Sequence, residues 1–328
     1  MQDQCEIDFN IYKELSDSHT EVRGVIHLDV DEFIKQKWVP EFIDDIWLDH
    51  FKQNLPNLVP SKQTDIGLNK VVVLVGASPA IKKQVEQYKS LDENFIIVSS
   101  NGAYKFLVEN GVIPKYVFVV EGRTHVEKDF EIFTEGTTLV AAPYVSPKII
   151  KNWKGPIEFY LLGGSTKYAS EIKKHFREDQ LDVGGGNVIS TAMLWAYKYL
   201  MCRHFIFTGV SLCYYEDYYW DKRDTSHVCS KEVFEDKVIK CVDMYGKIAN
   251  ITPSLCMYKT WLEAQTRFAP DATFTNSTED GVFGVYPQPI GRDGDDIQFQ
   301  LKFIPWINII PLSLAIEAYK KHFKEKMI

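Results

Sequence analysis

The sequence lacks a basic excess and closely spaced cysteines. Its 328 residues include 37 lysines and arginines against 45 acidic residues, which gives a net charge of −8. A broad surface for DNA or RNA needs clustered positive charge, so we expect no nucleic acid partner and only small-molecule nucleotides as ligands. The six cysteines contain no C-x-x-C pair, so neither a zinc knuckle nor a redox motif is indicated.

Long apolar segments are missing too. The most apolar stretch, residues 303–316, is interrupted by Pro305 and Pro311 and is short for a membrane-spanning helix. The first residues lack a basic segment followed by an apolar one, so no signal peptide is expected. We therefore expect a cytoplasmic protein whose contact with membranes is at most peripheral.

The sequence does contain the material of a globular α/β fold, with 45% apolar and 13% aromatic residues. From residue 71, short β-branched runs alternate with segments of helical period, which is the pattern of βαβ units. We predict a Rossmann-like, mostly parallel sheet with helices on both faces and helical extensions at both ends. The expected strands are Val71–Val75, Phe95–Ser99, Tyr116–Val120, Thr138–Ala142, Ile157–Leu161 and His204–Thr208, with helices near Pro79–Lys89, Ala103–Asn110, Thr166–Arg177 and Val188–Leu200.

Three regions follow from this pattern. Residues 1–65 are expected to form an N-terminal helical cap, residues 66–285 the main Rossmann-type domain, and residues 286–328 a C-terminal extension that ends in a helix. One face of that helix carries Ile316, Tyr319, Phe323 and Met327 beside several lysines. Such a helix can rest on an anionic membrane or a lipid-linked acceptor, but we expect it to pack on its own domain or on a second subunit.

Two glycine turns are candidates for binding a phosphate group. In the first, Gly76 and Ala77 follow a strand, Ser78 suits a helix N-cap and Pro79 the first helical position. In the second, Gly184, Gly185, Gly186 and Asn187 lead into the helix from Val188. A helix N-terminus after a parallel strand offers free N–H groups to an anion. We predict that both turns and Asn101 line one cleft. The alternatives are an ordinary capped helix for the first turn and a surface turn for the second.

The loop after the strand His204–Thr208 is the third candidate. It contains Ser211, Tyr214, Tyr215 and Tyr218, and His227 follows. Tyrosine hydroxyls can donate to a departing phosphate, and histidine suits general acid or base work near neutral pH. The alternatives are a lid or a dimer contact for the tyrosines and a structural role for the histidine.

These elements, in their order, resemble the MptE-like family, which includes archaeal 6-hydroxymethylpterin diphosphokinases and motility accessory factors and is distantly similar to bacterial sialyltransferases. The resemblance covers residues 45–285 and identifies residues 66–285 as an MptE-like transferase domain. Three positions depart from the family pattern, at Ser78, Lys115 and Glu121, and Ser211 stands where the family often has an acid. The matching pieces are Gly76–Ile81, Ser99-Ser100-Asn101-Gly102-Ala103, Asn110–Tyr116 with Glu121, Gly184–Val188, Gly209–Leu212 and Asn276–Gly281.

The resemblance implies a nucleotide-dependent transferase and leaves two chemistries open. We favour sialyltransferase-like glycosyl transfer from a cytidine-nucleotide sugar without a metal cofactor, with His227 as base and the tyrosines on the leaving phosphate. A diphosphokinase would instead need Mg²⁺ on ATP, with Glu121, Glu216 and Asp217 as ligands. A catalytically silent nucleotide-binding or assembly module is the third alternative. The acceptor is a glycan, a protein or a pterin.

Overall fold

The structure is a computed structural model. It describes residues 41–161, 169–177, 183, 187–215, 220–221, 239–293 and 296–326. Within these ranges the chain divides into two compact units. The amino-terminal unit comprises residues 41–77 and 84–205, and the carboxyl-terminal unit comprises residues 78–83 and 206–326. Both units are of the α/β class.

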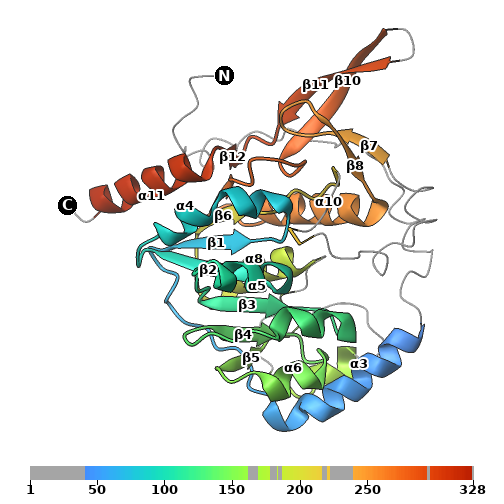
Figure 1. Ribbon diagram of the computed structural model, residues 1–328, viewed down its shortest axis with the longest axis vertical. Helices are drawn as coiled ribbons and strands as arrows, with labels where there is room; N and C mark the ends of the chain where they lie inside the picture. The colour runs from blue at the N-terminus through green and yellow to red at the C-terminus, as the bar shows by residue number, and fades with distance from the viewer. Residues whose placement is uncertain are drawn as a thin grey trace. The chain divides into compact units, whose positions relative to one another are not determined.

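The sheet of the amino-terminal unit follows the order of the chain, β1-β2-β3-β4-β5, and every pair is parallel (Figure 1). The register pairs Val71 with Phe95 and Tyr116 with Thr138. Side chains alternate between the two faces of a strand, yet every residue of β1, β3 and β4 is buried. Both faces of this sheet are therefore covered. The strands are β1 (Val71–Val75), β2 (Phe95–Ser100), β3 (Tyr116–Val119), β4 (Thr138–Ala141) and β5 (Ile157–Phe159).

Helices provide that cover. The apolar face of α8 carries Trp195, whose ring lies 4.9 Å from Tyr116 and 5.2 Å from Phe118 of β3. Helix α5 connects the parallel strands β2 and β3 and packs against both of them. The helices of this unit are α3 (Glu41–Asn54), η1 (Leu55–Asn57), α4 (Val85–Lys89), α5 (Asn101–Glu109), η3 (Thr124–Phe130), α6 (Pro147–Asn152), α7 (Ala169–Lys173) and α8 (Val188–Tyr199).

Helix α3 is fixed to the sheet by two side chains. The buried amide of Asn54 donates to the carbonyls of Pro143 and Val145, at 3.0 and 2.9 Å. The Trp47 ring stacks on Tyr144 with 4.4 Å between centroids, and a Cβ at Gly122 would lie 2.6 Å from that indole. These contacts place α3 over the ends of β3 and β4.

The carboxyl-terminal unit holds the strand order β12-β9-β6, and β12 runs parallel to β9. Two antiparallel hairpins are added to it, β7–β8 and β10–β11, the second with an irregularity between Pro289 and Gly291. Its elements are η2 (Pro79–Lys83), β6 (His204–Thr208), β7 (Ile239–Val242), β8 (Ile248–Ile251), α10 (Pro253–Arg267), β9 (Thr273–Asn276), β10 (Val285–Asp293), β11 (Asp296–Phe303), β12 (Ile307–Ile309) and α11 (Leu312–Lys326).

The apolar face of the terminal helix α11 is buried. Ile316, Tyr319 and Phe323 are at most 6% exposed, and the Tyr319 hydroxyl lies 3.3 Å from that of Thr275 in β9. The helix therefore packs on its own unit, one of the arrangements expected for it. No helix within the described ranges combines the length and the apolar character needed to span a bilayer.

The predicted Rossmann-like α/β fold is confirmed, and each of the six predicted strands is present. The helix predicted from Pro79 to Lys89 is wrong as one element. It is divided into η2 and α4, because Gln84 adopts φ −110° and ψ 7° between them.

Candidate functional site

Two loops meet beyond the carboxyl ends of β6 and β9, and we call residues 209–215 and 277–282 the β6/β9 loop cluster. The Val210 N–H donates to the Thr278 hydroxyl at 3.1 Å, and the Val282 N–H donates to the Ser211 carbonyl at 2.9 Å. Open α/β sheets bind their ligands at the carboxyl ends of the strands. We therefore place the candidate site of this unit at the cluster.

The backbone of the cluster is strained. Leu212 and Glu279 have positive φ values of 54° and 62°, a region that costs a residue with a side chain roughly 1–2 kcal/mol. Gly281 has φ 87° and lies directly against the Ser211 backbone, where any side chain would clash. Such strain persists only where surrounding contacts enforce it, and it gathers at functional sites.

Asp243, in the turn between β7 and β8, joins the hairpin to the cluster. Its side chain is 2% exposed and accepts hydrogen bonds from the Tyr215 hydroxyl at 2.7 Å and from the N–H groups of Tyr245 and Lys247 at 2.9 and 2.8 Å. The Tyr215 oxygen in turn accepts from the Gly281 N–H at 3.0 Å. Burial first and then the bond to Asp243 raise the pKa of Tyr215, so its phenol stays protonated at neutral pH.

Asp280 is the second carboxylate of the cluster. Its Oδ1 accepts a short hydrogen bond from the Ser211 hydroxyl. Burial raises the pKa of Asp280, the Ser211 bond opposes that shift, and the charge of Asp243 adds to it, so the net pKa lies above its ordinary value. Lys83 and Lys247 offset part of the negative charge.

Of the first predicted glycine turn, Ser78 lies against the start of this cluster. Its N–H, which was expected to face a phosphate, donates to the Gly209 carbonyl at 3.1 Å. Its hydroxyl is buried, with the residue 4% exposed, and no residue in the described ranges hydrogen-bonds to it. Pro79 begins the short helix η2, while Gly76 and Ala77 follow β1 and belong to the other unit.

Two of the predicted catalytic residues, Tyr214 and Tyr215, lie within the described residues. Tyr214 is 6% exposed and pairs with Asn250 through two backbone hydrogen bonds of 2.6 and 2.8 Å. Tyr215 is held by Asp243 as described above. Tyr218 and His227 lie outside the described residues.

In the amino-terminal unit, two predicted binding residues sit at the ends of neighbouring strands and are already paired. The Asn101 amide donates to the buried Asp129 carboxylate at 2.7 Å, and Gly102 is buried in the first turn of α5. Both oxygens of Glu121 accept from Arg123, from its N–H at 2.8 Å and its guanidinium at 2.6 Å. Burial raises the pKa of Glu121, but Arg123 outweighs it and the net pKa is lowered.

The second predicted turn ends in a helix cap. Asn187 accepts from the Ser190 N–H at 2.9 Å and donates its own N–H to the Ser190 hydroxyl at 3.0 Å, which forms a capping box for α8. Gly185 and Gly186 lie outside the described residues. The single cleft predicted for both turns and Asn101 therefore stays a prediction.

Metal ligands were expected only for the diphosphokinase alternative. No group of three or more His, Cys, Asp or Glu side chains suited to a metal occurs among the residues that the structure describes. Of the three predicted ligands, Glu121 is bound to Arg123, and Glu216 and Asp217 lie outside the described ranges.

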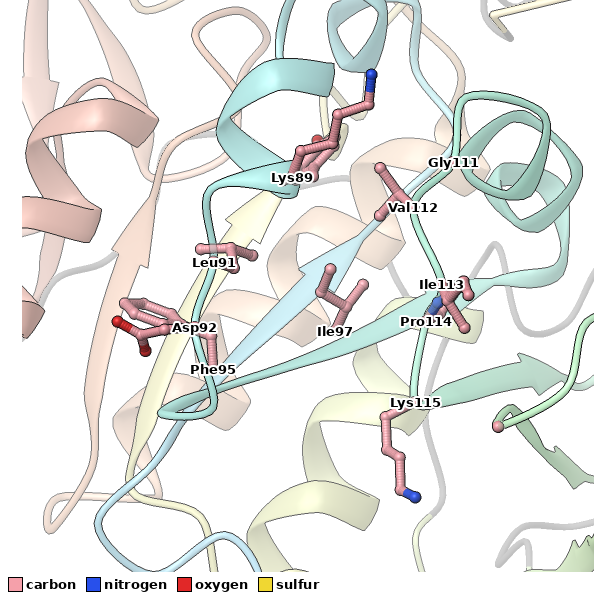
Figure 2. Close-up of a pocket in the computed structure, with 12 residues that line it drawn as sticks. Lys89, Leu91, Asp92, Phe95, Ile97, Gly111, Val112, Ile113, Pro114 and Lys115 are labelled. Carbon is pink, nitrogen blue, oxygen red and sulfur yellow. The ribbon is translucent and has the colours of Figure 1, made fainter.

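A cavity of about 370 Å³ opens at the amino ends of β2 and β3 (Figure 2). Leu91, Phe95 and Ile97 form much of its wall, and Figure 2 shows the Lys89 and Lys115 amines pointing in opposite directions away from it. Ligands of parallel sheets bind at the opposite, carboxyl end. This cavity is therefore separate from the candidate site.

Asp243 and Asp280 were missed as site residues by the sequence reasoning. Asp280 belongs to the stretch Asn276–Gly281, which contributed only to the family resemblance. It follows the strand β9, whose polar residues gave no strand signal in the sequence. For Asp243 a turn signal, Gly246, was present, but nothing local links it to Tyr215, 28 positions away.

The chain matches a protein family and a solved structure. A family model described as 6-hydroxymethylpterin diphosphokinase MptE-like matches residues 47–217, just over half of the chain. Among solved structures, the chain is similar to a MAf glycosyltransferase from Magnetospirillum magneticum AMB-1, with a TM-score of 0.60 and 17% identity, over 87% of this chain and 42% of that chain. The chain thus spans less than half the length of that protein, and the likeness shows the fold. No curated protein matches.

Proposed function

Because the chain belongs to the MptE-like family, we propose that it is a transferase and, more narrowly, that it transfers a glycosyl group from a cytidine-nucleotide sugar. The family match and a fold shared with a glycosyltransferase support the general class. The acceptor is proposed to be a hydroxyl group on a glycan, a protein or a pterin.

The observation that carries the glycosyl-transfer proposal is the Tyr215 phenol at the carboxyl end of β6. Its raised pKa keeps the proton that a leaving phosphate needs as a hydrogen-bond donor. In the free protein the Tyr215 hydroxyl donates this proton in a hydrogen bond to Asp243, which also accepts from two backbone N–H groups. A phosphate oxygen can replace Asp243 as the acceptor while Asp243 keeps two of its three hydrogen bonds.

The proposed step needs one more group. The acceptor oxygen attacks the anomeric carbon of the sugar, the bond from that carbon to the phosphate oxygen breaks, and the phosphate leaves with the electron pair. We assign the proton lost by the acceptor hydroxyl to His227, and a second hydrogen bond to the phosphate to Tyr218. Histidine suits this role because its pKa lies near the working pH.

Pyrophosphoryl transfer from ATP is the second candidate, since the matching family model carries a diphosphokinase description. That reaction requires carboxylates that hold Mg²⁺. Glu121 would have to release Arg123, which now occupies both of its oxygens. Glu216 and Asp217 are the remaining proposed ligands.

A nucleotide panel separates the two candidates. We expect CMP and CDP to raise the melting temperature without Mg²⁺, because selective binding stabilises the folded state. A shift caused only by ATP with Mg²⁺ would favour the diphosphokinase, and no shift with any nucleotide would favour a silent module.

The general base is tested by His227→Ala, with His175→Ala in the turn after α7 as the matched control. We expect His227→Ala to lower glycosyl transfer by about a hundredfold to ten-thousandfold with donor affinity retained, and His175→Ala to leave it unchanged. Full transfer by His227→Ala, or complete loss of wild-type activity on chelation of Mg²⁺, would contradict the glycosyl-transfer proposal.

A further inference from the structure

The two carboxylates of the β6/β9 loop cluster differ in how their oxygens are used. Asp243 is almost fully buried and receives three hydrogen bonds, one at Oδ2 and two at Oδ1. Asp280 is half-buried, and its Oδ1 receives one hydrogen bond, from Ser211. Among the residues that the structure describes, none donates to its Oδ2. Asp280 thus has one fixed oxygen and one open oxygen at the carboxyl end of β9.

We propose that the open Oδ2 of Asp280 accepts a hydrogen bond from the acceptor hydroxyl and orients it for attack on the donor sugar. This inference rests on the proposed glycosyl transfer and adds a residue that contacts the acceptor. It assigns the carboxyl end of β9 to the acceptor.

Charge decides between a hydroxyl and the donor phosphate at this position. Asp280 and Asp243 interact as like charges, and Glu279 and Asp280 both act on the exposed Tyr245. Lys83 and Lys247 offset part of the negative charge at Asp280. A phosphate oxygen has no proton to donate to Oδ2 and would meet its charge directly, whereas a neutral hydroxyl donates to a carboxylate through a strong charge-assisted hydrogen bond.

A second polar group without a partner among the described residues lies at the start of the same loop cluster. The Ser78 hydroxyl is buried against the same loop, where its backbone is bonded to Gly209, and it has no hydrogen-bond partner within the described ranges. Buried hydroxyl groups in native proteins nearly always have a partner.

Folding stability provides a readout of the Asp280 charge that does not depend on activity. Its folded pKa lies above the ordinary value of 3.8, so folding favours the protonated form. The stability associated with that proton is present below pH 3.8 and is lost as the pH rises through the folded pKa. At neutral pH the ionised Asp280 therefore lowers stability. The charge of Asp243 adds to the cost of burial, and Ser211, Lys83 and Lys247 offset only part of it.

The test is Asp280→Asn, which keeps the shape and an oxygen that can accept from Ser211 but removes the charge. We expect its melting temperature at neutral pH to exceed that of the wild type and the shift caused by CMP to be retained. With CMP-N-acetylneuraminate as probe donor and water as acceptor, release of CMP should fall roughly a hundredfold, the loss typical of a misplaced reactant. Glu317→Gln, which removes an exposed charge on α11 outside the cluster, should release CMP at the wild-type rate.

The outcomes are distinct. A purely structural carboxylate predicts that Asp280→Asn melts below the wild type at neutral pH, and this result overturns the inference. Wild-type release of CMP by Asp280→Asn also overturns it, while the proposed function stands. If the wild-type protein neither responds to CMP nor releases it from the donor, the proposed function fails and the inference fails with it.

Discussion

The two units differ in the environment of the acids at their strand ends, in both hydrogen bonding and the direction of the pKa shift. Glu121, after β3, has both oxygens bound to Arg123, and its net pKa is lowered. Asp280, after β9, has one open oxygen and a raised pKa. Position at the carboxyl end of a strand is therefore not sufficient to mark a reactive acid. An acid whose surroundings leave it poorly compensated is the better candidate for chemistry.

Replacing Glu263 on α10 should cause the largest loss of stability, because this buried acid is bound to Lys259 and to a backbone N–H. Its side chain is 5% exposed, lies 2.7 Å from the Lys259 amine and accepts from the Gly284 N–H at 2.8 Å. We expect Glu263→Ala to lower the free energy of unfolding by about 3–5 kcal/mol, since it leaves a buried ammonium unpaired. Urea denaturation measures this, and Lys259→Met combined with Glu263→Ala should recover part of the loss. A loss of unfolding free energy smaller than that of Tyr215→Phe would contradict this prediction.

Tyr215→Phe sharpens the comparison within the β6/β9 loop cluster. It removes the hydroxyl that joins Asp243 to the buried Gly281 N–H, and we expect a loss of about 1–3 kcal/mol in unfolding free energy. Tyr245→Phe is the matched control, because Tyr245 is 67% exposed and its change should stay within about 0.5 kcal/mol. Equal effects of the two variants would show that the hydroxyl of Tyr215 does not hold the cluster together.

Glu121→Gln gives the smallest effect but the most direct test of the contrast. Arg123 is 41% exposed, so solvent screening limits the expected loss at neutral pH to less than about 1 kcal/mol. Because the folded pKa of Glu121 lies below 4.5, its stabilisation is present above pH 4.5 and is lost as the pH falls through the folded value. The effect of Glu121→Gln should shrink on acidification, measured by thermal unfolding across pH. A loss that grows as the pH falls would mean that Arg123 does not stabilise the Glu121 carboxylate.

The sequence predicted the strands whose apolar residues are consecutive. The bounds of β1 and β6 agree with the structure at both ends, because runs such as Val71–Val75 are buried on both faces. Strand β9 was missed, since Thr273, Thr275 and Asn276 are polar by composition although they are buried. Their burial depends on distant partners such as Tyr319, which no local pattern reveals.

The candidate site was predictable only in part, for the same reason. Ser211 and Tyr215 were singled out because they follow a strand, and the structure places both in the β6/β9 loop cluster. Their carboxylate partners come from elsewhere in the chain, and Asp280 is 69 positions from Ser211. A single sequence carries no signal for such a pairing.

The stacking of Trp47 on Tyr144, with 4.4 Å between centroids and 7° between planes, supplies an intrinsic optical reporter. Indole emission depends on the polarity and the ring contacts around it, and this indole lies beside Gly122 where strand β3 has ended. Subtracting the spectrum of Trp47→Phe from that of the wild type isolates this one signal among seven tryptophans. Movement of α3 during ligand binding can then be followed in real time without an attached dye.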